Sequence, residues 1–178
     1  MAKAKVSQLT YADLQALPDD HRRYELIDGE LLVSPSPSTA HQRAVRCLLL
    51  ILHAACPPGH EVLTAPFDWL VDQRNVFVPD VIVARTADLT EANLPVAPLL
   101  AVEVLSPSTR SRDQVRKRAA YQHAGLGHYW LVDPLAASIT VLDRVDGQLT
   151  TTATASGDQP VTIVRPFPVT VVPADLTR

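Results

Sequence analysis

The spacing of hydrophobic and polar residues changes several times along this chain, and each segment of constant spacing predicts one helix or strand. From residue 39 to about 55, apolar residues recur at helical spacing, and Ser38 can cap the start of this helix. Continuous apolar runs of strand length follow, and a second helical stretch ends at Gly125, a usual left-handed helix stop. The elements expected in the core are a helix at about 39–55, strands at about 61–71, 76–83 and 99–105, a helix at about 111–124 and a strand at 129–133.

The segments on either side of this core predict smaller additions. Thr10 and Asp13 have the spacing of a capping box for a short helix, and Asp28-Gly29 between two strand-like runs predicts a tight hairpin. After the core, short strands are expected around 138–143, 148–154 and 161–172, with an Asp-Gly turn at 146–147.

A strand, a helix and another strand of one sheet predict a right-handed crossover, so the expected fold class is α/β (α+β), a mixed sheet flanked by helices. The chain has 178 residues, 47% of them hydrophobic, which suits one domain with a real core. We expect a single domain over 1–178, with a core at about 39–133, an N-terminal helix and hairpin at 10–34 and C-terminal strands at 137–172.

Composition narrows the location and the chemistry. No stretch approaches the roughly 20 apolar residues of a membrane helix, and the N-terminus lacks the apolar segment of a secretory signal, so a cytoplasmic protein without a membrane partner is expected. The two cysteines, Cys47 and Cys56, support neither a disulfide framework nor a structural zinc site.

The formal net charge of −3 argues against general affinity for nucleic acid, but the basic residues are unevenly distributed. Between residues 108 and 124, five cationic residues stand against one acidic residue, Asp113. This segment could contact phosphate groups, or it could form an ordinary solvated helix face.

Two acidic residues lie inside apolar strand-like runs, and they suggest a metal site. Asp80 and Glu103 would lose solvation worth several kcal/mol on burial unless they are paired, hydrogen-bonded or bound to a cation. A divalent cation between them explains both, because magnesium prefers oxygen ligands such as two carboxylates and the backbone carbonyl of Val104. Pro79 cannot donate a ladder hydrogen bond, which predicts an edge or an interruption beside Asp80.

Lys117 is the third member of this constellation and the only lysine beyond the first five residues. On the predicted helix it shares a stripe with Ala120, Tyr121 and Ala124, so this stripe is expected to face the sheet and to point the ammonium group inward. There it could orient or deprotonate water and stabilise charge on phosphorus. The alternative is a surface pair with Asp113, four residues earlier.

Several motifs in order resemble the Uma-type restriction endonuclease family, a branch of the PD-(D/E)XK nuclease superfamily. The motifs that carry the resemblance are Tyr-Glu-Leu-Ile-Asp-Gly-Glu from 24, Ser-Pro-Ser-Pro-Ser-Thr-Ala-His-Gln from 34, Val-Pro-Asp-Val from 78, Glu-Val-Leu-Ser-Pro-Ser-Thr from 103, Asp-Gln-Val-Arg-Lys-Arg-Ala-Ala-Tyr from 113 and Tyr-Trp-Leu-Val-Asp-Pro from 129. The resemblance implies a restriction-endonuclease-like core in which Asp80 and Glu103 are metal ligands and Lys117 is the catalytic lysine.

One position departs from the superfamily pattern. Two residues after Glu103 the motif requires lysine, whereas this chain has Leu105. The Uma-type pattern moves the lysine to the next helix, which Lys117 satisfies. If Lys117 does not reach the carboxylates, the site is inert.

Further residues are candidates with open alternatives. Glu25, a characteristic position of the family, could complete the shell of the cation or could face outward from its strand. His41, another characteristic position, could polarise water or contact phosphate, or could be a neutral partner of a backbone group or carboxylate. Tyr121 is a possible accessory residue. The candidates for nucleic-acid binding are Ser106, Ser108, Thr109, Arg110, Arg112 and Arg116, although helix capping also explains the hydroxyl residues.

These observations together predict a Mg²⁺-dependent (or Mn²⁺-dependent) endonuclease that hydrolyses DNA phosphodiester bonds through attack by a metal-activated water. Cutting both strands of a duplex would favour a homodimer or higher homo-oligomer. A non-catalytic module that retains the nuclease fold and binds nucleic acid or protein is the alternative, motivated by Leu105 and the acidic net charge. A hydrolase of a small phosphorylated substrate is a third hypothesis.

Overall fold

The computed structural model describes residues 8–18, 20, 22–106 and 112–178, with the side chains of 112–114 excepted. Among the described residues, no helix is both long and apolar enough to cross a lipid bilayer. The helical elements are α1 (Tyr11–Gln15), α2 (Thr39–Ala55), η1 (Thr86–Asp88), η2 (Arg112–Lys117), α3 (Arg118–His123) and η3 (Pro173–Thr177). The strands are β1 (Arg23–Ile27), β2 (Glu30–Ser34), β3 (His60–Thr64), β4 (Asp68–Asp72), β5 (Asn75–Phe77), β6 (Val81–Arg85), β7 (Asn93–Leu94), β8 (Leu100–Val104), β9 (His128–Asp133), β10 (Ser138–Val145), β11 (Gln148–Ser156), β12 (Val161–Ile163) and β13 (Val169–Val171).

Within the described part of the chain, the strands form two main sheets and a small third one. The first sheet has the order β2-β1-β5-β4-β7, and the second has the order β11-β10-β9-β8-β6-β3, while β12 pairs with β13. In the second sheet β8 and β9 are parallel and the other neighbours are antiparallel. The expected mixed sheet with flanking helices is therefore confirmed.

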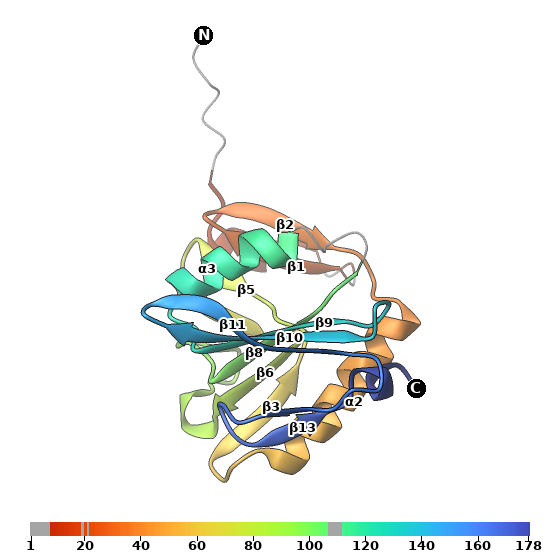
Figure 1. Ribbon diagram of the computed structural model, residues 1–178. Coiled ribbons are helices and arrows are strands. Elements are labelled where there is room, and N and C mark those ends of the chain that lie inside the picture. Colours follow the sequence, from red (N-terminus) through yellow and green to blue (C-terminus); the bar gives the residue numbers. More distant parts are fainter. Residues whose placement is uncertain (1–7, 19, 21, 107–111) are drawn as a thin grey trace.

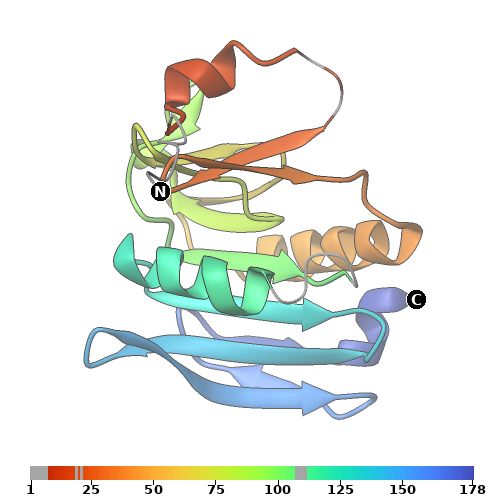
Figure 2. The same cartoon turned by 90° about the horizontal axis from the view of Figure 1, so that it is seen from above.

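Two layers of core cover the two faces of the second sheet. Helix α2 and strand β13 pack on one face, whereas α3 lies between the other face and the β1–β2 hairpin (Figure 1). Figure 2 shows α1 beside this hairpin, at the opposite end of the molecule from β10 and β11. The α3 side is thus enclosed by both sheets.

Successive side chains of β8 point to opposite faces of the second sheet. Leu100, Val102 and Val104 pack in the α2 core, whereas Ala101 and Leu105 pack in the core beside α3. Glu103 shares the α3 side with Ala101 by the same period of two. Leu105, at the position where the superfamily motif has lysine, is a buried core residue on this face.

The predicted strands at 61–71, 76–83 and 161–172 are each wrong in one respect, because each is two strands. The breaks contain Pro66, Pro79 and Pro166, which cannot donate to a ladder. At the first two breaks the chain changes sheets: β3 and β6 belong to the second sheet, and β4 and β5 belong to the first. The interruption expected at Pro79 is confirmed, and it places Asp80 between the sheets.

The other local predictions are largely confirmed. Helix α2 has the expected bounds, and the Ser38 side chain accepts a hydrogen bond from the His41 N–H. Thr10 and Asp13 form the reciprocal capping box of α1. The expected helix at 111–124 begins as a π-helical turn, η2, and continues as α3 to the stop at Gly125, whose φ is +90°. π-Helical turns are rare and recur at functional sites.

Candidate active site between the two sheets

Three carboxylates and one ammonium group from four parts of the chain meet in the interior. Glu25 lies in the middle of β1, Asp80 lies between β5 and β6, and Glu103 lies on β8. Lys117 ends η2, the turn that leads into α3. All four side chains are at most 2% exposed, so their charges must be compensated by neighbouring charges and hydrogen bonds.

Lys117 bridges two of the carboxylates. Its Nζ lies 2.8 Å from Oε1 of Glu103 and 2.9 Å from Oε1 of Glu25. The inward orientation predicted from the helical stripe is therefore observed, and the ammonium group reaches the acidic cluster from the helix. Lys117 is therefore a buried cation shared by two anions, and it is not the weak surface ion pair that was the alternative.

Tyr121 adds a neutral donor to the same oxygen. Its hydroxyl donates to Oε1 of Glu103 at 2.5 Å. Burial, followed by the negative charge of Glu103, raises the pKa of Tyr121 well above its usual value. The phenol therefore stays protonated at neutral pH, and it fixes the orientation of the carboxylate.

Asp80 is bound at both oxygens. Oδ2 accepts a hydrogen bond from the Val104 N–H at 2.7 Å. Oδ1 lies 3.3 Å from Nε2 of His41 and also accepts a hydrogen bond from Nη1 of Arg23. Burial would raise the pKa of Asp80, but the hydrogen bond from His41 and the charge of Arg23 outweigh it and hold the pKa well below its usual value. Asp80 is therefore ionised at neutral pH.

Glu25 faces inward, so the alternative of an outward-facing strand residue is wrong. Its Oε1 accepts the Val78 N–H at 2.9 Å in addition to the contact with Lys117. Val78 lies in the break between β5 and β6, so Glu25 binds the segment that carries Asp80. This carboxylate therefore links β1 to the segment between β5 and β6.

Arg23 is the site residue that the sequence did not single out. Its guanidinium contacts Asp80, and its Nε lies 4.0 Å from Oε2 of Glu25. Arg23 and Glu25 are two residues apart on β1 and so share one face of the strand. Once Glu25 is taken as a site residue, that period is the signal that could have found Arg23.

The remaining predicted residues lie in different places. His41 contacts Asp80, and Val104 meets Asp80 through its N–H. Ser106 lies two residues after the end of β8. Ser108, Thr109 and Arg110 lie outside the described residues, and for Arg112 only the backbone is described.

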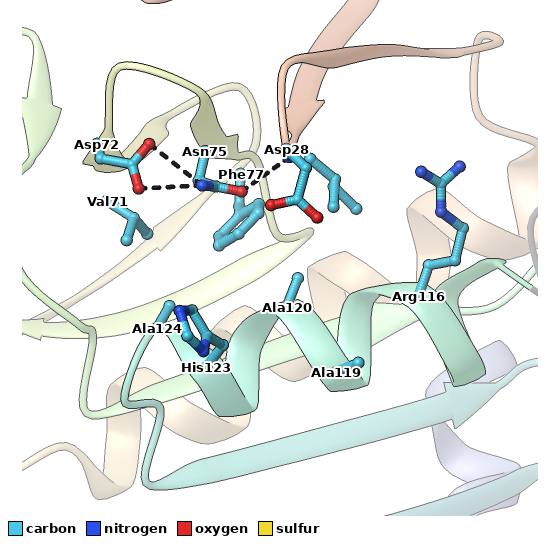
Figure 3. Close-up of a pocket in the computed structure, with 11 residues that line it drawn as sticks. Asp28, Val71, Asp72, Asn75, Phe77, Arg116, Ala119, Ala120, His123 and Ala124 are labelled. Atoms are coloured by element: carbon cyan, nitrogen blue, oxygen red, sulfur yellow. Dashed lines mark hydrogen bonds between the residues drawn. The ribbon is translucent and has the colours of Figure 1, made fainter. Parts of the chain in front are cut away.

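Arg116 forms a two-point pair with Glu30 of β2, at 3.2 and 2.8 Å. It lines a pocket of about 450 Å³ between α3 and the turns of the first sheet. In Figure 3 Ala119, Ala120 and Ala124 form the helix wall of this pocket, opposite Asp72 and Asn75.

The donor set suits a hard divalent cation, although no group of three or more His, Cys, Asp or Glu side chains in the described residues is arranged to hold one. Asp80 and Glu103 offer carboxylate oxygens, and magnesium commonly takes one or two carboxylates and fills the rest of its shell with water and phosphate oxygens. Among the described side chains of the cluster, three carboxylates face two permanent cations, Arg23 and Lys117. The formal charges of these five side chains sum to −1.

Comparison with known proteins gives one family and one fold. The model of the Uma2 family, described as "Putative restriction endonuclease", matches residues 11–176. Among solved structures, the chain is similar to "a putative nuclease belonging to DUF820" from Anabaena variabilis ATCC 29413, with a TM-score of 0.72, 17% identity and coverage of 95% of this chain and 97% of that chain. The comparison with curated proteins gave no significant match.

Proposed function

Because the chain belongs to the Uma2 family, whose description is "Putative restriction endonuclease", we propose that it is an endonuclease that hydrolyses DNA phosphodiester bonds with a divalent cation, Mg²⁺ or Mn²⁺. The fold shared with the Anabaena protein agrees with this assignment. The proposed substrate, metal and residue roles rest on the geometry of the buried cluster.

The net charge of the cluster is the observation that carries the proposal. A divalent cation would change the net charge from −1 to +1, and the single negative charge of a phosphodiester would then bring it to zero. A buried site is most stable when its charges are compensated, so this one suits a metal and a phosphodiester together.

Each residue of the cluster has a role that follows from its contacts. Asp80 and Glu103 would hold the cation, which when bound supplies Lewis-acid polarisation of water and of the phosphate group. The Val104 N–H fixes the Asp80 carboxylate by binding Oδ2. Tyr121 and Lys117 both bind Oε1 of Glu103 and fix its orientation.

Lys117 replaces the lysine that the superfamily motif places at position 105. Leu105 packs in the core, whereas Lys117 brings its ammonium group to Glu103 from the helix. A positive charge next to the metal ligands would stabilise negative charge that develops on phosphorus. Glu25 binds the same Nζ and so positions it.

A nuclease assay tests this proposal. Wild type and the variants Asp80→Ala and Glu103→Gln are incubated with supercoiled plasmid and with single-stranded DNA in Mg²⁺ or Mn²⁺. We expect metal-dependent cleavage by wild type and a loss of roughly 100-fold or more in each variant, as for removal of a group that supports the transition state. Asp158→Ala is the matched control, because Asp158 is an exposed carboxylate that pairs with Arg178. Equal activity of wild type and Asp80→Ala would contradict the proposal.

The second candidate is a non-catalytic module that binds nucleic acid. It is favoured by the contacts of Arg23 and Lys117, which already compensate much of the carboxylate charge. Calorimetric titration with duplex DNA distinguishes the two functions. Binding that is unaffected by chelator and by Glu103→Gln, without cleavage, would support the module.

A further inference from the structure

Arg23 is a permanent cation placed among the acidic residues of the site. It begins β1, and its side chain is 21% exposed, more than any of the four central side chains. Burial lowers its pKa, but the charges of Asp80, Glu25 and Glu103 outweigh this and raise the pKa above its usual value. The guanidinium therefore stays charged, and it lies close to two carboxylates, those of Asp80 and Glu25.

The contact between Arg23 and Asp80 is less complete than an ordinary structural pair. Only Nη1 reaches the carboxylate, and Nε is buried without a hydrogen-bond partner among the described residues. By contrast, Arg116 and Glu30 form two parallel contacts. A one-point pair with an unsatisfied buried donor is easier to exchange than a two-point pair.

Asp80 does not depend on Arg23 for its orientation. Its Oδ2 is bound by the Val104 N–H at 2.7 Å, and His41 lies 3.3 Å from Oδ1. If Arg23 left, the carboxylate would remain in position with an oxygen open to another cation. A divalent ion near Asp80 would also repel the guanidinium, because both are positive and little water separates them.

We propose that Arg23 is the counter-ion of Asp80 in the metal-free protein, that it gives up this carboxylate when a divalent cation binds, and that it then pairs with a phosphate oxygen of the substrate. This inference rests on the proposed function, since it takes Asp80 as a metal ligand. A guanidinium matches the geometry of phosphate oxygens, and the partial exposure of Arg23 leaves it accessible to a ligand. Arg23 thus sets the metal affinity and couples metal binding to substrate binding.

Calorimetric titration with Mn²⁺ tests the first step. The proteins compared are wild type, Arg23→Met, Arg22→Met and Asp80→Asn, all as the full chain. We expect Arg23→Met to bind Mn²⁺ roughly tenfold more tightly than wild type, because a competing positive charge has been removed. Arg22→Met is the matched control and should stay within about twofold, because Arg22 is the preceding residue in the chain and its charge is solvent-screened at 64% exposure. Asp80→Asn should bind most weakly.

Binding of duplex DNA, measured by fluorescence anisotropy, tests the second step. Ca²⁺ serves as the divalent cation, so that binding can be followed with little cleavage. In chelator, Arg23→Met and wild type should bind DNA alike, because Arg23 is occupied by Asp80. In Ca²⁺, Arg23→Met should bind roughly tenfold more weakly. A deficit of equal size in both conditions would overturn the exchange.

The outcomes separate this inference from the proposed function. If Asp80→Asn loses Mn²⁺ binding but Arg23→Met binds no more tightly than wild type, the role of Arg23 is overturned and the metal site stands. If Asp80→Asn binds Mn²⁺ as wild type does, the proposed metal site itself fails. If Arg23→Met does not fold, as judged by circular dichroism, a crystal structure of wild type with Mn²⁺ decides. Arg23 turned away from Asp80 supports the exchange, and a retained contact overturns it.

Discussion

At the scale of single residues, Lys117 has the greatest influence on the stability of the site, because two buried carboxylates share its ammonium group. We expect Lys117→Met to lower the free energy of unfolding by about 3–5 kcal/mol, as when one partner of a buried ion pair is removed. Urea denaturation in the presence of chelator measures the loss.

Two further variants serve as the control and the rescue for Lys117→Met. Arg116→Met removes an exposed cation of the same segment and should cost at most about 1 kcal/mol. The triple variant Lys117→Met, Glu25→Gln, Glu103→Gln should regain much of the stability, because no uncompensated charge stays buried. A loss below about 1 kcal/mol for Lys117→Met would show that the two carboxylates do not depend on this ammonium group.

The pKa of Asp68 is shifted in the opposite direction to that of Asp80. Burial raises its pKa, the charge of Glu25 adds to this effect, and a hydrogen bond from Tyr11 opposes it. Because the folded state holds the proton more tightly than the unfolded state, Asp68 makes folding more favourable as the pH falls from the raised pKa toward the ordinary value of about 3.9.

The variant Asp68→Asn checks this sign. At pH 7 we expect it to be more stable than wild type, since a half-buried charge has been removed, and the difference should narrow as the pH falls toward 4. Thermal unfolding over this pH range gives the comparison. Asp158→Asn, on the surface, should show no such convergence, and an unchanging gap for Asp68→Asn would contradict the raised pKa.

At the scale of elements, Arg144 attaches the end of α3 to the β10–β11 hairpin. Its Nε donates to the carbonyl of Leu126 at 3.0 Å, Nη1 donates to that of Gly147 at 2.9 Å, and Nη2 contacts that of Gln122. The Gln122 carbonyl belongs to the last turn of α3, and the Leu126 carbonyl belongs to the segment directly after the helix stop at Gly125. The position of the helix over the site thus depends on a residue of another element.

We expect Arg144→Met to cost about 2 kcal/mol of unfolding free energy and to accelerate amide exchange in the last turn of α3, because a charged donor to three carbonyls is lost. Arg118→Met, which removes one donation to the Leu149 carbonyl, should cost less. Hydrogen exchange followed by mass spectrometry measures both. Unchanged exchange in the α3 peptides of Arg144→Met would contradict this attachment.

The helices, the hairpins and the face of β8 that carries Glu103 could be predicted from the sequence, because each depends on a local period or turn. The sheet to which each half of the broken strands belongs could not, since residues 61–71 and 76–83 are apolar on both sides of Pro66 and Pro79. The inward position of Lys117 followed from its stripe. Arg23 was missed because a charged residue at the start of a strand has no local pattern to distinguish it from a surface arginine.

At the scale of the whole molecule, an aromatic cluster joins both sheets through α3. Trp69 and Phe77 of the first sheet pack on each other with ring centroids 5.1 Å apart, and both contact Tyr121, at 5.2 and 5.0 Å. Tyr121 packs in turn on Tyr129 of the second sheet at 5.2 Å. The two sheets should therefore unfold together.

The two tryptophans allow this to be measured, since Trp69 lies in β4 of the first sheet and Trp130 lies in β9 of the second. The variants Trp69→Phe and Trp130→Phe each leave one reporter. We expect fluorescence and far-UV circular dichroism to give the same urea midpoint within each variant, as in a two-state transition. Trp69→Ala should lower the unfolding free energy by about 3–5 kcal/mol. Midpoints that differ between the two probes would show that the sheets unfold separately.

Lys117 stands on a helix rather than on a strand, and this makes its contacts with Glu25 and Glu103 sensitive to insertions. If the end of the helix at Gly125 stays fixed, a residue added between Glu103 and the helix only lengthens the connection. A residue added between Lys117 and Gly125 would instead rotate the ammonium group by about 100° around the helix axis. One such addition would turn Lys117 from the acidic cluster toward solvent. Insertions of a full turn, three or four residues, would restore its direction but shift it by about 5 Å along the axis. The chain should therefore tolerate changes of length before the helix, but hardly any between Lys117 and Gly125.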